Sequence, residues 1–297
     1  MIGYLLIIVY TFLNLSESVF VRTYAKKHGS GGMLMNAIVA LFATLFFLVT
    51  DADGFHAPLE MLPLAILNAF LFGAGFYCTF AAYKCGPYGL TRLIGNFALL
   101  FTIFYGIFFL GETPKITTYI GIVMIFAAMV LINYQKKEAA TAKKADTEEE
   151  KEPGVSLKWL ILVTVSLVAN GFIGILTRMQ QIKFNDTCSS EFQIISIGGS
   201  FILLAVIGLI LDRDKLPYFL KHGTVYGIGA GICNGAKNFL TLVIYMLLPL
   251  SIISPMKTGL GMIATFALAL LIYKEKYTKK QIVGVILGAV AVILLAI

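Results

Sequence analysis

Four charged side chains lie inside long apolar runs of this sequence: Glu17, Arg92, Lys237 and Lys257. A charge at membrane depth costs about 2.5–3.5 kcal/mol on insertion scales, which makes each of them a candidate binding or transport residue. Three cations against one carboxylate leave an excess of positive charge, and this excess suits a substrate that carries a carboxylate or phosphate group. Lys237 lies deepest in its run, beside two asparagines, and is the strongest of the four candidates.

A structural role stays open for these charges. Glu17 can pair with a basic residue and so neutralise both groups. Arg92 and Lys257 can reach the membrane interface along their aliphatic stems. The charges alone therefore leave a binding role and a structural role side by side.

Polar residues accompany the charges at helical spacing. The two stripes are Tyr10, Asn14, Glu17 and Ser18 in the first run, and Asn234, Lys237, Asn238, Thr241 and Tyr245 in the eighth. Lipid cannot satisfy polar stripes of this length, so each needs a protein partner or a water-filled lumen. We therefore expect both stripes to face one central cavity.

The ninth run carries a proline close to its start. Ser254-Pro255 is followed by Lys257 and Thr258, and proline removes a backbone donor and frees the carbonyl four residues before it. Broken helices bind ligands in many transporters, so the sequence predicts a broken helix beside the site here.

Further candidates lie in the fourth run and among the tyrosines. Arg92 and Asn96 stand near the start of the fourth run, which corresponds to the ninth in the second half. Tyr10, Tyr77 and Tyr245 can line a lumen and stack on a substrate, or serve as packing and interface residues.

Long apolar runs, each ended by a small charged cluster, must position these residues. Of the 297 residues, 59% are hydrophobic and 13% are charged, whereas a soluble domain is about half apolar and a quarter charged. Runs of roughly 18 apolar residues cross a bilayer as helices, because lipid offers the backbone no outside partner. The expected spans are 2–22, 33–50, 61–83, 88–110, 116–134, 157–177, 192–211, 223–247, 250–272 and 280–297. The first lacks a basic start and a clear cleavage site, so we expect a retained span.

The chain divides into two similar halves, 1–134 and 157–297, joined by the hydrophilic linker 135–156. Two pairs of matching positions relate the halves: Asn14 and Arg22 recur as Asn170 and Arg178, and Glu112 with Gly121 recurs as Glu275 with Gly284. Five spans per half force opposite orientations in the membrane. The predicted fold is therefore an all-α integral membrane protein, with ten transmembrane helices in two inverted five-helix repeats.

The segments FLGETPKITTYIGIVMIFAAMVLI (109–132) and LIYKEKYTKKQIVGVILGAVAVILL (271–295) resemble the two ends of the EamA-type repeat of the drug/metabolite transporter superfamily. The resemblance covers essentially the whole chain, although Lys274 stands where the family has glycine. It implies a ten-helix transporter with a central site between the halves. It leaves the substrate open, because the superfamily moves amino acids, sugars, phosphorylated metabolites, nucleotide sugars, amines and drugs.

Three functions compete on this evidence. The first is a secondary active transporter of a small anionic or zwitterionic metabolite, such as an amino acid, organic acid or phosphorylated compound, with Glu17 as a candidate carrier of a coupling proton. The alternative is a proton-coupled exporter of cationic or lipophilic drugs or amines that uses Glu17. The third is a channel or structural subunit, but the two halves place different polar groups where a channel needs matching rings.

Enzyme chemistry finds no support in the sequence. There is no P-loop and no HExxH motif, and the three histidines fall in predicted loops. The four cysteines form no CxxC pair and are expected as reduced thiols. We predict no cofactor and no metal site.

The net charge of +7 resides in short loops, where it indicates topology and contact with anionic lipid, and not a nucleic-acid site. Most of the 23 Lys and Arg residues fall in the loops after spans one, three, five, seven and nine, which predicts that these loops face the cytoplasm and both termini face outward. Relatives in the superfamily are usually drawn with cytoplasmic termini, so the orientation stays open. The expected location is a bacterial cytoplasmic membrane, the expected partners are a small-molecule substrate and lipid, and a homodimer stays open.

Overall fold

The computed structural model describes residues 2–28, 31–51, 54–86, 88–132, 156–271 and 278–296. Throughout these ranges the regular secondary structure is helical, with no strand. An all-helical fold follows from the composition, because apolar runs in lipid must satisfy their own backbone groups. Most of the predicted linker 135–156 lies outside the described residues.

The helices of the first half lie at the expected spans, but the first helix continues to His28 beyond the expected end at residue 22, and the fourth expected span is divided. They are α1 (Ile2–His28), α2 (Gly32–Thr50), the short 3₁₀ turn η1 (Leu59–Met61), α3 (Leu62–Cys85), α4 (Tyr88–Asn96), α5 (Leu99–Phe104), the π-helical turn η2 (Tyr105–Phe109) and α6 (Ile116–Ile132). Pro63 stands in the first turn of α3, where its missing N–H costs no helical hydrogen bond.

The elements of the second half are α8 (Leu157–Lys183), α9 (Ser189–Leu211), the 3₁₀ turn η3 (Arg213–Lys215), α10 (Leu216–His222), α11 (Thr224–Leu247), α12 (Leu250–Leu271) and α13 (Lys279–Ala296). They differ in detail from those of the first half, because the short helix α10 is added and the single helix α12 stands in place of α4, α5 and η2. Ser156 caps α8 by accepting a hydrogen bond from the backbone N–H of Trp159 at 3.1 Å.

Seven helical stretches in the described ranges are long and apolar enough to cross a membrane. They are 2–25, 32–50, 59–85, 157–183, 189–211, 224–247 and 250–268. Two shorter apolar stretches, 93–109 and 116–131, fall in the expected fourth and fifth spans. The chain is therefore an all-helical, multi-pass integral membrane protein.

The helix break predicted at Pro255 is found elsewhere. Helix α12 continues through Pro255, which is compatible because proline can adopt helical φ and costs one backbone hydrogen bond. The expected fourth span, 88–110, is instead interrupted between α4 and α5. There the N–H groups of Phe97 and Ala98 bond to the carbonyls of Ile94 and Gly95, three residues back. Gly95 and Asn96 have low helix propensity, which favours a break at this point.

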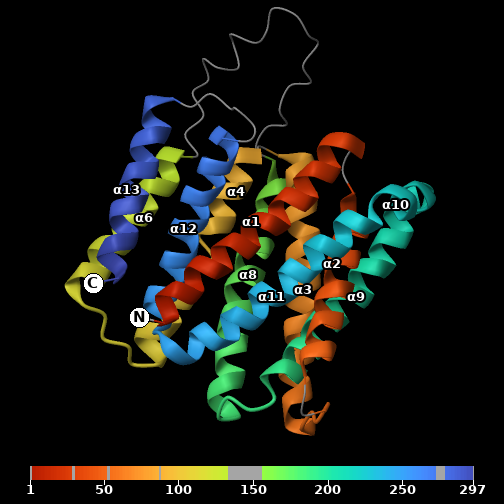
Figure 1. The fold of residues 1–297 in the computed structure, drawn as a ribbon, viewed down its shortest axis with the longest axis horizontal. Helices are drawn as coiled ribbons and strands as arrows, with labels where there is room; N and C mark the ends of the chain where they lie inside the picture. The colour runs from red at the N-terminus through yellow and green to blue at the C-terminus, as the bar shows by residue number, and fades with distance from the viewer. Residues whose placement is uncertain are drawn as a thin grey trace, which may run out of the picture.

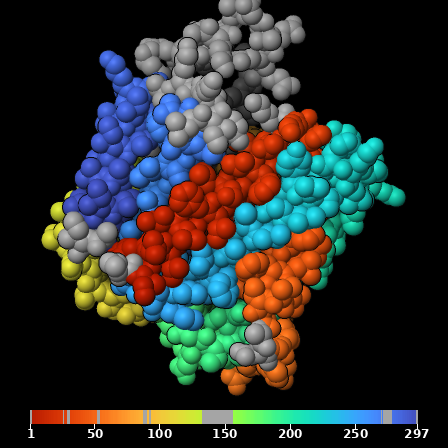
Figure 2. Space-filling model, viewed as in Figure 1, coloured from red at the N-terminus to blue at the C-terminus, as the bar shows by residue number. Residues whose placement is uncertain are grey.

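The helices form one bundle in which elements of the two halves pack against each other. Contacting pairs are α1 with α11 and α12, α8 with α3 and α5, α2 with α9, and α6 with α13. Figure 1 shows the beginning of α1 and the end of α13 at one end of the bundle, whereas α6 ends and α8 begins at the other end. Figure 2 shows α1 on one face of the molecule, flanked by α11 and α12.

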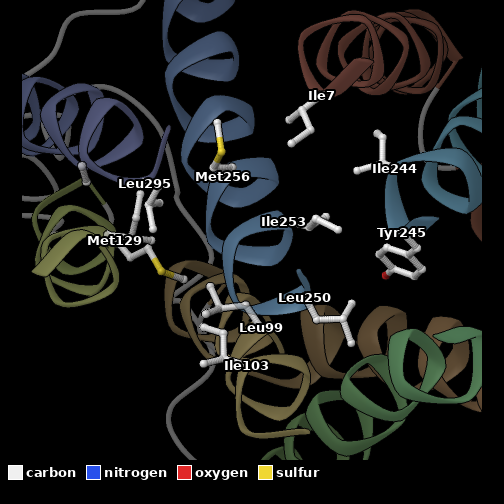
Figure 3. Packing of buried hydrophobic residues seen from close by; sticks show 12 residues of the cluster. Ile7, Leu99, Ile103, Met129, Ile244, Tyr245, Leu250, Ile253, Met256 and Leu295 are labelled. Atoms are coloured by element: carbon white, nitrogen blue, oxygen red, sulfur yellow. The ribbon is translucent and has the colours of Figure 1, made fainter. Parts of the chain in front are cut away.

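Helix α12 is central to the largest apolar cluster. Its residues Leu250, Ile253 and Met256 are buried. In Figure 3 they lie between Ile7 of α1 on one side and Leu295 of α13 on the other. This packing fixes the first turns of α12, and with them the height of the polar residues that follow Pro255.

Candidate functional site

A polar network joins α1 to α11 inside the bundle. The Lys237 ammonium forms an ion pair with Glu17 Oε2, and it donates a hydrogen bond to Asn14 Oδ1 at 3.1 Å. Asn234 donates through Nδ2 to Glu17 Oε1 at 2.9 Å, and Asn238 donates to Asn234 Oδ1 at 2.9 Å. Asn14 and Glu17 of the first predicted stripe therefore face the second stripe and pair with its polar groups. Ser18 is exposed and donates to the Asn14 carbonyl of its own helix.

The Glu17–Lys237 pair carries no net charge. The side chains are 17% and 15% exposed, so the pair lies largely away from solvent, where an unpartnered charge would be costly. Neither residue lines the central cavity described next. The structure therefore shows Glu17 paired with a basic residue, which is the structural alternative that the sequence left open.

A central cavity of about 560 Å³ lies between the two halves. A cavity of this size falls within the range that holds small metabolites. Its walls come from α1, α3, α4, α5, α8, α9, α11 and α12, and its polar lining residues are Tyr10, Asn14, Asn96, Thr102, Asn170, Thr177, Gln193, Asn238, Thr241, Tyr245, Ser254, Lys257, Thr258 and Thr265. The cavity is thus polar although the bundle around it is apolar.

Lys257 is the charged residue of this lining. Its ammonium donates to Thr241 Oγ1 at 3.0 Å and lies 4.0 Å from the centre of the Tyr10 ring, with Tyr245 at 5.8 Å. No carboxylate of the described residues lies within 4.0 Å of it. Contact with an aromatic face stabilises a cation by about 0.5–2 kcal/mol but leaves its charge uncompensated.

The cavity wall also offers neutral hydrogen-bonding groups. Gln193 of α9 is 4% exposed, and its Oε1 atom has no hydrogen-bond partner within the described structure. Elsewhere in the lining Thr102 of α5 donates to Ser254 Oγ at 2.6 Å. The Gln193 oxygen can accept a hydrogen bond from a polar molecule in the cavity.

The predicted site residues separate into groups. Those on the cavity wall are Tyr10, Asn14, Asn96, Asn238, Tyr245, Lys257 and Thr258. Glu17, Asn234 and Lys237 form the adjoining network. Tyr77 is 37% exposed and lines neither this cavity nor the smaller one near it. Arg92 belongs to α4, and its side chain lies outside the described part of the structure.

Several lining residues escaped the prediction. Thr102 is a single polar residue in an apolar run, whereas Thr177 and Gln193 stand near the ends of their runs, close to charged residues; packed helices show both patterns. Asn170 matches Asn14 in the repeat but is not among the predicted site residues, although that repeat relation is the signal that could have placed it at the cavity.

The Gly-Glu signature before α6 has a clear structural role. Gly111 has φ +65°, a left-handed conformation that suits glycine. Glu112 then accepts hydrogen bonds from the backbone N–H groups of Leu250 at 2.8 Å and Ser251 at 2.9 Å. The carboxylate therefore caps the N-terminus of α12, where negative charge is favourable. The corresponding Lys274-Glu275 lies outside the described residues.

Comparisons with known proteins agree with this architecture. No curated protein matches the chain by sequence. A solved crystal structure, described only as that of a protein, matches 99% of this chain and 98% of its own, with a TM-score of 0.69 and 14% sequence identity. At this identity the likeness concerns the fold alone. The model of the EamA-like transporter family matches residues 1–134. The resemblance carried by the segment 109–132 is thereby confirmed, and the first part of the chain matches the EamA-like transporters of the drug/metabolite transporter superfamily.

Proposed function

We propose that this membrane transporter is a secondary active carrier of a small anionic or zwitterionic metabolite, with the central cavity as its binding site. The observation that carries this proposal is Lys257, a cation on the cavity wall without a carboxylate partner among the described residues. A substrate carboxylate or phosphate would supply the missing charge, and the nearby hydroxyl and amide groups would orient the rest of the molecule.

In many secondary transporters, alternating access is based on two structurally similar halves with opposite orientations in the membrane. A second sequence pattern supports such an inverted repeat in this chain. The pattern Gly-Ala-x₄-Thr-x₃-Tyr-x₃-Pro begins at Gly73 in the first half and at Gly235 in the second. Each occurrence begins in the third expected span of its half, on α3 in the first half and on α11 in the second. We infer ten transmembrane helices in two inverted five-helix repeats from this recurrence and from the matching positions of Asn14 and Asn170.

Equivalent packing between the halves supports the same inference. Helix α11 packs on α2 and α1, and α3 packs on α9 and α8, which are the counterparts of α2 and α1. A side chain at Gly235 would meet Phe46 of α2, and one at Gly73 would meet Leu203 of α9. The two glycines thus serve the same close contact in each half.

We place this carrier in the cytoplasmic membrane of a bacterium.

Replacing Lys257 tests the proposed anion site. Lys257→Met keeps much of the side-chain volume and removes the charge, and we expect at least tenfold weaker binding of carboxylate or phosphate ligands, because hydrogen bonds to charged groups contribute about 1.5–3 kcal/mol. Lys257→Arg should retain part of the affinity. Ligand-induced changes in melting temperature over a panel of metabolite anions and organic cations provide the measurement, followed by transport of the hits in proteoliposomes.

The double variant Glu17→Gln/Lys237→Met is the matched control, because it removes one positive and one negative charge beside the cavity. It should retain anion binding. If Lys257→Met binds anions as well as the unmodified protein, the site assignment fails. If organic cations stabilise the protein and anions do not, the cation exporter becomes the better reading. That outcome is disfavoured because Lys237 and Asn234 already occupy the Glu17 carboxylate.

A further inference from the structure

A second, smaller cavity of about 330 Å³ lies beside the first. Its polar lining residues are Thr79, Tyr83, Thr91, Asn96, Ser166 and Asn170. Thr79 and Ser166 share a hydrogen bond at 2.5 Å, and Asn170 donates to the Ser166 carbonyl at 2.8 Å. The lining is therefore rich in hydroxyl and amide groups, and none of its residues carries a charge.

Residues that line this cavity in the first half correspond to residues of the second half that line the central cavity around Lys257. The shift that aligns the two Gly-Ala-x₄-Thr-x₃-Tyr-x₃-Pro patterns brings Thr79 onto Thr241 and Tyr83 onto Tyr245. Continued into the next helix, the same shift brings Asn96 onto Thr258. Each of the three partners lines the central cavity.

Helices α8 and α1 extend the correspondence. The shift that aligns Asn170 with Asn14 also brings Ser166 onto Tyr10. Asn170 and Ser166 line the smaller cavity, and Asn14 and Tyr10 line the central one. The two cavities are thus equivalent in position but differ in chemistry.

The difference lies in the charges. Gly95 holds the position that corresponds to Lys257, and Gly75 holds the one that corresponds to Lys237. Both glycines line the smaller cavity, and a Cβ atom at Gly95 would meet nothing within 4 Å. The first half therefore offers open space and neutral polar groups where the second half offers ammonium groups.

The two cavities also share wall residues. Gly95, Asn96 and Asn170 line both of them, so one molecule can contact groups of each. An anionic group would lie at Lys257, and a polar but uncharged group would lie against Thr79 and Ser166.

We propose that the smaller cavity is a neutral subsite that accepts the hydroxyl- or amide-bearing end of a substrate whose anionic end lies at Lys257. This inference rests on the proposed function and narrows its substrate class to metabolites with one acidic group and a separate hydroxylated or amide-bearing part. Hydroxyl and amide side chains favour such a part over a hydrocarbon tail, because an oxygen atom that already takes part in one hydrogen bond can accept another from a hydroxyl or amide group, which a hydrocarbon tail does not offer.

Gluconate and hexanoate are suitable probes, because both are six-carbon carboxylates and only gluconate is hydroxylated along its tail. Binding to the purified full-length protein is measured by titration calorimetry. Gluconate should bind more tightly than hexanoate. Thr79→Val with Ser166→Ala should weaken gluconate binding roughly five- to thirtyfold, as expected for one or two lost neutral hydrogen bonds, and should leave hexanoate binding unchanged.

Thr44→Val is the control for folding, because Thr44 also bonds a backbone carbonyl at 2.8 Å within its helix and lines neither cavity. Equal affinity for the two probes, or no binding of gluconate, would overturn the subsite. Equal weakening of both probes in the Thr79/Ser166 variant would overturn it too. Lys257→Met separates the two proposals: if it leaves gluconate binding intact while the Thr79/Ser166 variant weakens it, the anion site has failed and the neutral subsite remains.

Discussion

Lys237 and Lys257 lie near each other along the bundle but meet different electrostatic surroundings. Lys237 is neutralised by Glu17 and held by Asn14, whereas Lys257 contacts the Thr241 hydroxyl and an aromatic face. The residue type alone therefore does not decide the role of an intramembrane lysine. The partner on the facing helix decides whether the charge is part of the scaffold or available to a substrate.

Breaking the Glu17–Lys237 pair on one side should destabilise the protein more than removing both charges. Lys237→Met leaves the Glu17 carboxylate without its cation, and we expect a loss of about 3 kcal/mol in the free energy of unfolding. The double variant Glu17→Gln/Lys237→Met should recover most of that loss. Melting temperatures of Lys237→Met, of Glu17→Gln and of the double variant in detergent provide the test. Additive effects would show that the two charges do not interact.

At the residue scale, the sequence predicted which residues gather near the cavity better than it predicted which atoms each of them contacts. Helical spacing correctly put Tyr10 and Asn14 on one face of α1, and that face does meet the polar face of α11. The spacing contained no information on which facing atoms would pair, because this depends on the rotation of one helix against the other. Lys237 therefore ranked above Lys257 in the sequence, whereas the structure places only Lys257 on the cavity wall.

At the scale of elements, the start of α12 depends on a residue from the other half of the chain. Glu112 lies just before α6, yet its carboxylate accepts the N–H groups of Leu250 and Ser251. This contact links the Gly-Glu signature to the helix that carries Lys257. The glutamate of the signature thus caps a helix of the other half, whereas Gly111 provides the left-handed turn that precedes it.

Glu112→Ala should remove this cap. We expect a loss of about 2 kcal/mol of stability, because two backbone donors lose a charged acceptor at a helix N-terminus. Glu112→Gln keeps one acceptor oxygen and should lose about half as much. Thermal unfolding of the purified variants measures the effect, and equal melting temperatures for all three proteins would contradict the capping role.

Close helix packing should make Gly231 intolerant of a side chain. A Cβ atom there would lie 2.5 Å from Phe42 Cβ and 2.9 Å from the backbone oxygen of Val39, and a backbone atom cannot move aside cheaply. Gly231→Ala should therefore lower the melting temperature even though alanine is the better helix former. Gly261→Ala is the control, since a Cβ atom there meets nothing within 4 Å. A Gly231→Ala protein as stable as this control would contradict the packing.

At the scale of the whole molecule, the sequence predicted the helices well because hydropathy alone sets which segments enter lipid. The expected span 250–272 agrees with α12 within a residue at each end. The break lies at Asn96 and not at the predicted Pro255, because proline can continue a helix, as Pro255 does, whereas Gly95 and Asn96 have low helix propensity. The cavity itself could not be predicted, since it is the space that the two halves leave between them.

Loop charge makes a prediction about how the whole bundle sits in the membrane. The exposed loop after α8 contains Asn185, and the exposed loop after α9 contains Lys215. The 23-residue helix α9 separates the two loops by about 35 Å at 1.5 Å per residue. Lys and Arg are concentrated in the loops on the Lys215 side. The positive-inside rule therefore puts Lys215 in the cytoplasm and Asn185 outside, together with the beginning of α1 and the end of α13.

Single cysteines at these two positions test the orientation. In a background where Cys78, Cys85, Cys188 and Cys233 are replaced by serine or alanine, a membrane-impermeant thiol reagent should label Asn185→Cys in intact cells. Lys215→Cys should react only after the cells are opened, because the bilayer separates it from the reagent. Uptake or binding activity of the cysteine-free protein confirms that it remains folded. The reverse labelling pattern would show that the termini face the cytoplasm, and that loop charge does not set the topology of this chain.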